Sequence, residues 1–273
     1  MMTTTHTNSK AAAHVSHTPR PADLFEAVFD ISYLAFDLIA AIIFFIWANG
    51  RVLFDLYGIL TLVLCIGDAF HLVPRVVRAL RGTNPQIKRY LGRGLQISSI
   101  TMTVFYILLM YIWKETFPQF SLVPAIVYAV WISATIRIII CLLPQNDWTG
   151  DNSQKSSAPQ ASGTKQASDT KQANGAPQAS DTKQASDTLR LRMSIMRNAV
   201  FVVTGLCVMW LYASSGTAHG LEMQRMVWAI AISFACYLPV TVLSRRYPLV
   251  GMLMIPKTCA YIWMIVMGLQ LLF

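Results

Sequence analysis

The sequence has little charge for its length. Only 13% of its 273 residues are Asp, Glu, Lys or Arg, whereas 55% are hydrophobic and the mean hydropathy is +0.48. Soluble domains carry roughly 25% charged residues, so this composition argues against a soluble enzyme and predicts membrane spans instead. The formal net charge of +9 is then loop charge that faces the cytoplasm and anionic lipid, and we expect no nucleic-acid partner.

Paired cysteines are also lacking, and we expect no secretory leader in the first residues. The five cysteines all lie inside apolar runs, their number is odd, and none is spaced as CxxC. This pattern argues against a disulfide framework and against a cysteine metal site. Residues 1–24 are polar and small, without the charged start, apolar core and cleavage site of a signal peptide.

Seven apolar stretches predict an all-α fold, a polytopic bundle of about seven transmembrane helices. Each stretch is long enough to cross about 30 Å of hydrocarbon at about 1.5 Å per residue. The predicted spans are 25–48, 52–75, 94–114, 121–143, 196–214, 225–244 and 249–272. The chain divides accordingly into a disordered cytoplasmic tail (1–24), helices one to four (25–143), a linker (144–195) and helices five to seven (196–273).

The loop charges predict how the bundle lies in the membrane. Seventeen Lys and Arg residues fall in segments on one side, and only Arg51, Lys114 and Arg225 fall on the other. Positive charge stays inside, so the N-terminus is predicted inside and the C-terminus outside. We expect a multi-pass protein of the plasma membrane, in a bacterium the cytoplasmic membrane. The bilayer is its expected partner, with anionic lipid headgroups at Arg75, Arg78, Arg81, Lys88 and Arg89.

A repeat occupies much of the predicted linker. From Ala158 to Asp187 a hexad recurs five times, as APQASG, TKQASD, TKQANG, APQASD and TKQASD. No apolar residue in it is larger than Ala, so the segment cannot bury enough surface to offset its chain entropy. The prediction is a disordered cytoplasmic tether between helices four and five.

The stretch 59–78 carries the most unusual chemistry. It begins as an apolar run and then places Asp68, His71 and Arg75 at i, i+3 and i+7, on one face of a helix. Ionisable groups in hydrocarbon are costly unless paired, so they usually face a bundle interior or a water-filled cavity. We expect Arg75 to snorkel to the interface rather than join a site.

Five ionisable residues fall well inside the predicted spans, and the predicted topology puts all of them in the cytoplasmic half: Asp37, Asp68, His71, Arg137 and Lys257. Two acids and two bases balance, as burial of charge requires. The hypothesis is a polar chamber in which Asp37, Arg137, Lys257 and Tyr261 bind a ligand or pair their charges, with Tyr33 as a further hydrogen-bonding neighbour. The structural alternative is a set of helix-to-helix ion pairs.

Several functions suit such a chamber. Asp68 and His71 are the catalytic candidates, because a carboxylate can orient an imidazole for acid–base work. Arg137 or Lys257 could hold a phosphate or an oxyanion. The same groups could instead relay protons or bind a small anion. Binding or transport of a small molecule or ion is the first hypothesis; a lipid-directed hydrolase and a membrane sensor or assembly partner are the alternatives.

One motif resembles a known family. Gly67-Asp68 at the end of an apolar run is similar to the Gly-Asp motif of the YhhN lysoplasmalogenase family, and the closing helix Tyr261–Leu272 is loosely similar too. The resemblance implies a membrane hydrolase of lysolipid vinyl ethers with acidic residues on separate helices. It reaches Asp68 only, because residues 197–273 contain Glu222 and no Asp, and because the family has eight spans.

Two further resemblances lead to no cofactor. Seven spans with the N-terminus inside resemble the adiponectin-receptor-like and ceramidase-related hydrolases, which hold zinc with three histidines. Only His71 lies in a span here, so we expect no metal. Lys257 in the last helix resembles a retinal Schiff-base lysine by its position. The third helix offers no carboxylate counter-ion, although Asp68 could stand in for one.

Overall fold

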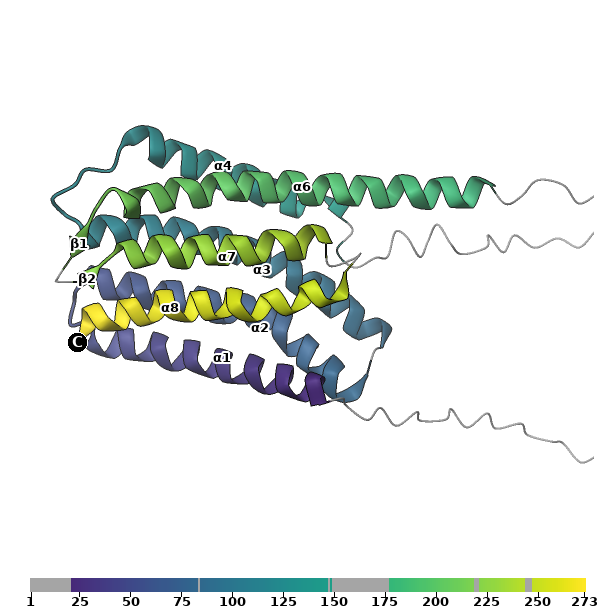
Figure 1. The fold of residues 1–273 in the computed structure, drawn as a ribbon, viewed down its shortest axis with the longest axis horizontal. Coiled ribbons are helices and arrows are strands. Elements are labelled where there is room, and N and C mark those ends of the chain that lie inside the picture. Colours follow the sequence, from purple (N-terminus) through teal and green to yellow (C-terminus); the bar gives the residue numbers. More distant parts are fainter. Residues whose placement is uncertain (1–20, 83, 147, 149–176, 219–220, 244–246) are drawn as a thin grey trace, which may run out of the picture.

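The computed structural model describes residues 21–82, 84–146, 148, 177–218, 221–243 and 247–273. Seven α-helices of these residues lie side by side in one elongated bundle (Figure 1). They are α1 (Pro21–Trp47), α2 (Val52–Arg81), α3 (Pro85–Thr116), α4 (Pro124–Leu142), α6 (Pro177–Ala213), α7 (Gln224–Leu243) and α8 (Met254–Leu272). Apart from α7, each is long and apolar enough to cross a membrane. The protein is therefore an all-α, polytopic membrane bundle.

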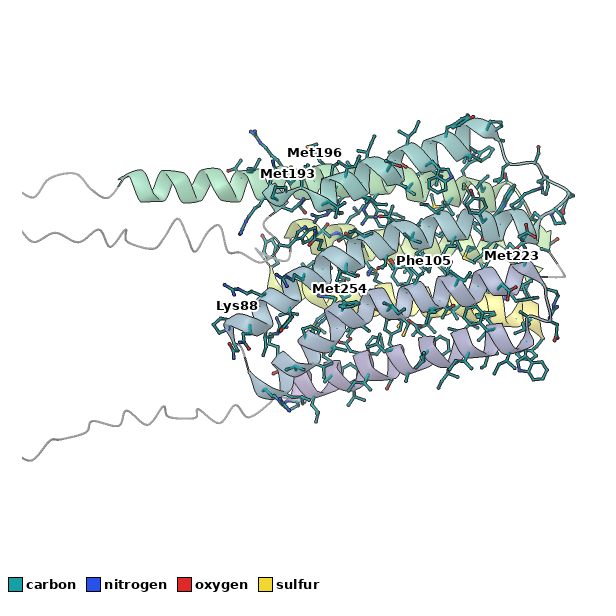
Figure 2. The ribbon with its side chains drawn as sticks, turned by 180° about the vertical axis from the view of Figure 1, so that it is seen from behind. Lys88, Phe105, Met193, Met196, Met223 and Met254 are labelled. Atoms are coloured by element: carbon teal, nitrogen blue, oxygen red, sulfur yellow. The ribbon has the colours of Figure 1, made fainter. Side chains whose placement is uncertain are left out.

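The helices form a closed arrangement. Each packs against its neighbour in the chain, and α8 returns to pack against both α1 and α2, while α3 also contacts α6. Because the number of helices is odd, α1 begins at one end of the bundle and the chain finishes at the other (Figure 1). Lys88 and Met254 lie at the end where α1 begins, and Met223 lies at the opposite end (Figure 2).

Local chemistry explains where the helices start and turn. Asn49 and Gly50 adopt positive φ angles of 48° and 74°, which lets the chain reverse between α1 and α2. Asn84 caps α3 by accepting a hydrogen bond from the backbone N–H of Gln86 at 3.2 Å, and Pro85 follows at the first helical position. At the far end, strands β1 (Thr217–Ala218) and β2 (Leu221–Glu222) pair antiparallel between α6 and α7.

The link between α2 and α3 is shorter than predicted. The predicted spans ended at residue 75 and resumed at residue 94, but α2 continues to Arg81 and α3 begins at Pro85. Hydropathy marks only the length of a helix that lies within the hydrocarbon, so the prediction missed the polar turns of α2 and α3 that project beyond it. Arg78, Arg81, Lys88 and Arg89 are exposed on these turns; their contact with anionic headgroups stays a prediction.

The linker prediction was wrong over its last part. Helix α6 begins at Pro177 rather than at residue 196, so the final hexads are helical. They are rich in Ala, Gln and Lys, which favour helix, and a helix already anchored by its apolar part extends without a new nucleation step. The predicted tail over residues 1–20 and the tether over 149–176 lie outside the described residues.

The last predicted span is divided in two. A short 3-10 helix, η2 (Pro248–Leu253), precedes α8, which begins at Met254. Pro256 falls in the first turn of α8, where the N–H it lacks would have no helical partner in any case. This start places Lys257 one turn inside the helix, close to the end of the bundle.

Candidate ligand-binding cavity

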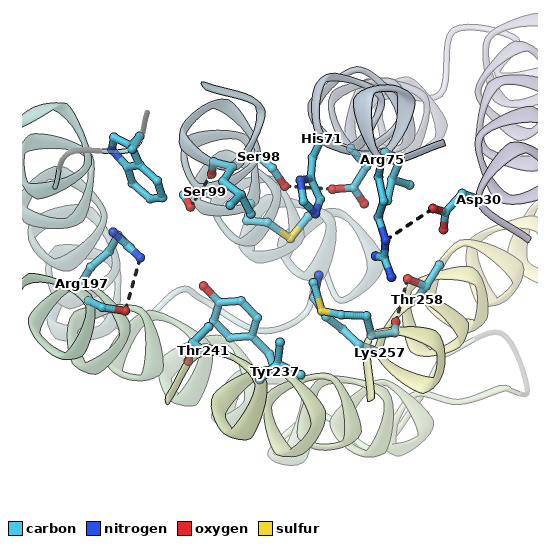
Figure 3. A pocket seen from close by; sticks show the side chains of 18 of the residues that line it. Asp30, His71, Arg75, Ser98, Ser99, Arg197, Tyr237, Thr241, Lys257 and Thr258 are labelled. Carbon is cyan, nitrogen blue, oxygen red and sulfur yellow. Dashed lines mark hydrogen bonds and ion pairs between the residues drawn. The ribbon is translucent and has the colours of Figure 1, made fainter. Parts of the chain in front are cut away.

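A cavity of about 470 Å³ opens inside the end of the bundle that is predicted to face the cytoplasm. All seven α-helices contribute to its wall, and pockets of about 300–1,000 Å³ are typical of small-molecule sites. The polar and charged side chains on the wall are Glu26, Asp30, Asp68, His71, Arg75, Ser98, Ser99, Arg137, Asn146, Arg190, Ser194, Arg197, Tyr237, Thr241, Lys257 and Thr258. Figure 3 shows His71 and Lys257 reaching toward the middle from α2 and α8, with Tyr237 of α7 beside them.

Asp68 is held by two hydroxyl groups from neighbouring helices. The Tyr33 hydroxyl donates to Asp68 Oδ2 at 2.9 Å, and the Ser98 hydroxyl donates to Oδ1 at 2.9 Å. Gly67 makes the second bond possible, because a Cβ at that position would collide with Thr101 of α3, one turn beyond Ser98. The Gly-Asp pair therefore has a local meaning: the glycine admits α3, and α3 brings the donor to the acid.

His71 lines the same cavity but does not pair with Asp68. Its Nδ1 atom is buried and has no hydrogen-bond partner among the described residues, and the donors to Asp68 are the hydroxyls of Tyr33 and Ser98. The carboxylate–imidazole bond that the spacing suggested is not made in this arrangement. Catalysis by these two residues stays a prediction of the sequence.

Three cationic side chains are fixed around the cavity by aromatic rings. The Arg137 guanidinium is 0% exposed and lies 3.3 Å from the Phe201 ring centroid. The Arg197 guanidinium stacks 4.2 Å from the Trp148 ring and donates to Asn146 Oδ1 at 2.8 Å. Lys257 is only 7% exposed. Its ammonium lies 4.9 Å from the centroid of the Tyr261 ring and 5.6 Å from that of the Tyr237 ring. Such contacts stabilise a cation without neutralising it.

Two carboxylates of the cavity wall, Glu26 and Asp30, lie beside Arg75 rather than beside these three bases. Arg75 pairs with Glu26 and lies 4.0 Å from Asp30, so the prediction that Arg75 snorkels away from the site was wrong. Its guanidinium meets two acids of α1 on the cavity wall instead. Across the part of the chain that the structure describes, no carboxylate lies within ion-pair distance of Arg137, Arg197 or Lys257. The helix-to-helix ion pairs offered as the structural alternative are therefore not made by these three bases.

Two of the predicted ligand-binding residues lie outside the cavity wall. Asp37 is 0% exposed, and neither of its carboxylate oxygens has a hydrogen-bond partner. Tyr261 is buried and packs edge-on against Phe105 at 5.4 Å between ring centroids. Asp68, His71, Arg137 and Lys257, by contrast, share one wall.

Sequence reasoning missed several wall residues. Ser98 was an unremarked polar residue in a predicted span, although the pair Ser98-Ser99 beside Gly94 could have signalled a polar helix face. Arg197 was counted only as a loop charge, because the start of α6 was placed too late. Glu26 and Asp30 lie near the predicted end of the first helix, where acids usually meet water.

Comparison of the chain with protein-family models, curated proteins and solved structures gives no match. The resemblance of Gly67-Asp68 to the YhhN family stays a prediction of the sequence. What the cavity does is argued below from its own geometry.

Proposed function

We propose that this membrane protein binds a small anion, one with a phosphate, sulfate or carboxylate group, in the cavity at its basic end. Five bases and three acids line the wall: Arg75, Arg137, Arg190, Arg197 and Lys257 against Glu26, Asp30 and Asp68. The wall therefore carries an excess of positive charge inside a bundle of low dielectric constant. Attraction between opposite charges is stronger there than in water, so an anion gains from entering.

Lys257 is the single observation that carries the proposal. Its ammonium lines the cavity and, among the described residues, has neither an ion pair nor a side-chain hydrogen bond. A buried ammonium can donate three hydrogen bonds and is costly to leave unpaired. An anionic group beside it would supply those acceptors and offset the cost.

Arg137 and Arg197 add two guanidinium groups to the cavity wall. Arg197 is locked by Trp148 and Asn146, and Arg137 lies against Phe201. A planar guanidinium suits phosphate and carboxylate because it can donate two parallel hydrogen bonds. Side chains fixed before binding lose little entropy on binding, so the arrangement favours affinity.

The alternative of a lipid-directed hydrolase has less support from the geometry. It would use Asp68 to orient His71, yet the Nδ1 atom of His71 has no hydrogen-bond partner in the described part of the chain and the donors to Asp68 are Tyr33 and Ser98. The binding proposal needs no rearrangement of these groups. The hydrolase remains a hypothesis, and a substrate that re-orients His71 would revive it.

Thermal unfolding of the full-length protein in a neutral detergent tests the proposal. Inorganic phosphate, sulfate, succinate and a short-chain lysophosphatidate are compared with chloride at equal ionic strength. An anion present at about 100 times its Kd stabilises the folded state by about 2.7 kcal/mol. Lys257→Gln should weaken binding about tenfold or more, because a charge-assisted hydrogen bond contributes about 1.5–3 kcal/mol. A response to lysophosphatidate alone would identify a lipid headgroup, and one to free phosphate a soluble anion.

Arg225→Gln is the matched control. Arg225 is also a base, but it is exposed at the opposite end of the bundle, at the start of α7. It should bind the anion as the wild type does. If no anion shifts the unfolding temperature more than chloride does, or if both variants lose the shift equally, the proposal is wrong.

A further inference from the structure

Asp37 is a buried acid that the cavity does not account for. It lies two helical turns deeper than Asp30 on the same face of α1, it is 0% exposed, and both its oxygens lack a hydrogen-bond partner. No base of the described residues lies within ion-pair distance of it. An ionised carboxylate in such surroundings is among the most costly groups to bury, whereas a protonated one is far less so.

The charged surroundings of Asp37 reinforce this conclusion. The titratable groups that act on Asp37 and its neighbour Tyr33 are Asp68 and Cys65 of α2 and Tyr261 of α8. None of them is a base, and Asp68 is a second acid. A second negative charge beside Asp68 would be repelled.

A polar path leads from Asp37 to the cavity. Tyr33 lies one helical turn nearer the cavity on the same face of α1. Its hydroxyl donates to Asp68 Oδ2 at 2.9 Å, and Asp68 lines the cavity. In the other direction the buried face of α1 continues through Ala40, Ala41 and Phe44, which offer no side-chain polar group.

We propose that Asp37 is a proton-binding site that is loaded and emptied through the Tyr33 hydroxyl and Asp68, on the cavity side. To empty the site, the Asp37 carboxyl turns toward Tyr33 and gives its proton to the hydroxyl oxygen. The hydroxyl passes its own proton to Asp68 Oδ2. One O–H bond breaks and one forms at Tyr33, so the tyrosine ends neutral, Asp37 becomes a carboxylate and Asp68 a carboxylic acid. Loading runs in reverse.

Infrared spectroscopy of the full-length protein in detergent at neutral pH tests the site without any ligand. The wild type should show a carboxylic-acid C=O band that Asp37→Asn removes and Asp30→Asn keeps. On transfer from H₂O to D₂O the band shifts as the proton exchanges. Tyr33→Phe should keep the band but slow this shift about tenfold or more, which corresponds to an activation free energy raised by about 1.4 kcal/mol. Tyr237→Phe, which removes a hydroxyl from the cavity wall on α7 rather than from the path beside Asp37, should leave the rate unchanged.

Two results would overturn the proposal. One is a wild-type spectrum at neutral pH without a carboxylic-acid band, a result that needs no variant to fold. The other is an exchange rate that is the same in Tyr33→Phe and in the wild type. The anion-binding measurement reads unfolding temperature and a different residue, Lys257, so each proposal can fail while the other stands.

Discussion

The same seven helices build two unlike halves of the bundle. The half where α1 begins contains the cavity and its charged wall. The other half is closed by rings and long side chains: Phe44 stacks on Tyr57 with 5.2 Å between ring centroids, Trp113 packs on Phe117, and the Tyr212 hydroxyl donates to the Leu109 carbonyl at 3.1 Å. The Tyr57 hydroxyl and the Trp113 indole N–H of this half are buried without a hydrogen-bond partner among the described residues, so packing rather than hydrogen bonding closes it.

This difference separates two tasks. Close packing between helices stabilises the fold through dispersion and shape, since lipid tails offer no hydrophobic advantage over a neighbouring helix. The open half gives up such contacts and keeps bases without acidic partners. The free energy of unfolding should therefore depend mainly on the closed half, and ligand affinity on the open half.

The largest effect on stability should come from emptying the closed half. Phe44→Ala removes a fully buried ring that lies against Tyr57, which should cost about 3–5 kcal/mol of unfolding free energy. Met254→Ala shortens a side chain on the cavity wall and should cost much less, because one side of it already lacks partners. Reversible unfolding in mixed micelles measures both. Equal losses would show that the two halves do not differ in this respect.

A smaller loss of unfolding free energy should come from forcing α2 and α3 apart where Gly94 meets Phe70. A Cβ at Gly94 would collide with the backbone carbonyl of Phe70, which cannot rotate away. Gly94→Ala should therefore cost about 1–3 kcal/mol, as overpacking generally does. Gly251→Ala is the control, since nothing lies within 4 Å of a Cβ there. The same unfolding assay compares them, and a stable Gly94→Ala protein would contradict the close approach of the two helices.

The smallest effect concerns a single hydrogen bond of the open half. Ser98→Ala removes one of the two donors to Asp68 and should cost about 1 kcal/mol. Ser99→Ala removes a neighbouring hydroxyl that bonds only the backbone carbonyl of Leu95, and it should change stability by much less. If the two variants unfold alike, the Asp68 network contributes nothing that the helix backbone does not.

The class of fold was predictable because apolar runs of membrane length leave few alternatives. The sequence analysis also placed Asp37, Asp68, His71, Arg137 and Lys257 in the cytoplasmic half of the bundle, by counting residues along helices of opposite direction. The structure puts all of them but Asp37 on one cavity wall. Depth is a one-dimensional quantity, and helix geometry fixes it without knowledge of packing.

Rotation and pairing were not predictable in this way. Nothing in the spacing of Asp68 and His71 shows that Tyr33 and Ser98, rather than His71, donate hydrogen bonds to Asp68. Asp37 and Arg137 were predicted to bind a ligand or pair their charges, yet Asp37 has no hydrogen-bond partner among the residues described and the Arg137 guanidinium lies over the Phe201 ring. Which side chains meet depends on how each helix turns about its own axis, and a close approach such as that of Gly67 to Thr101 becomes visible only once two helices are packed.

The hydrogen bonds of Asp68 also bear on how the protein is made. Its donors come from α1 and α3, which flank it in the chain, so these three consecutive helices can satisfy the acid by themselves once they are inserted. The bases without acidic partners come from α4, α6 and α8, which follow α3 in the chain. Biogenesis therefore has an order: the acid is hydrogen-bonded early, within an insertion intermediate that contains α1 to α3, and the cationic half is complete only when α8 packs against α1.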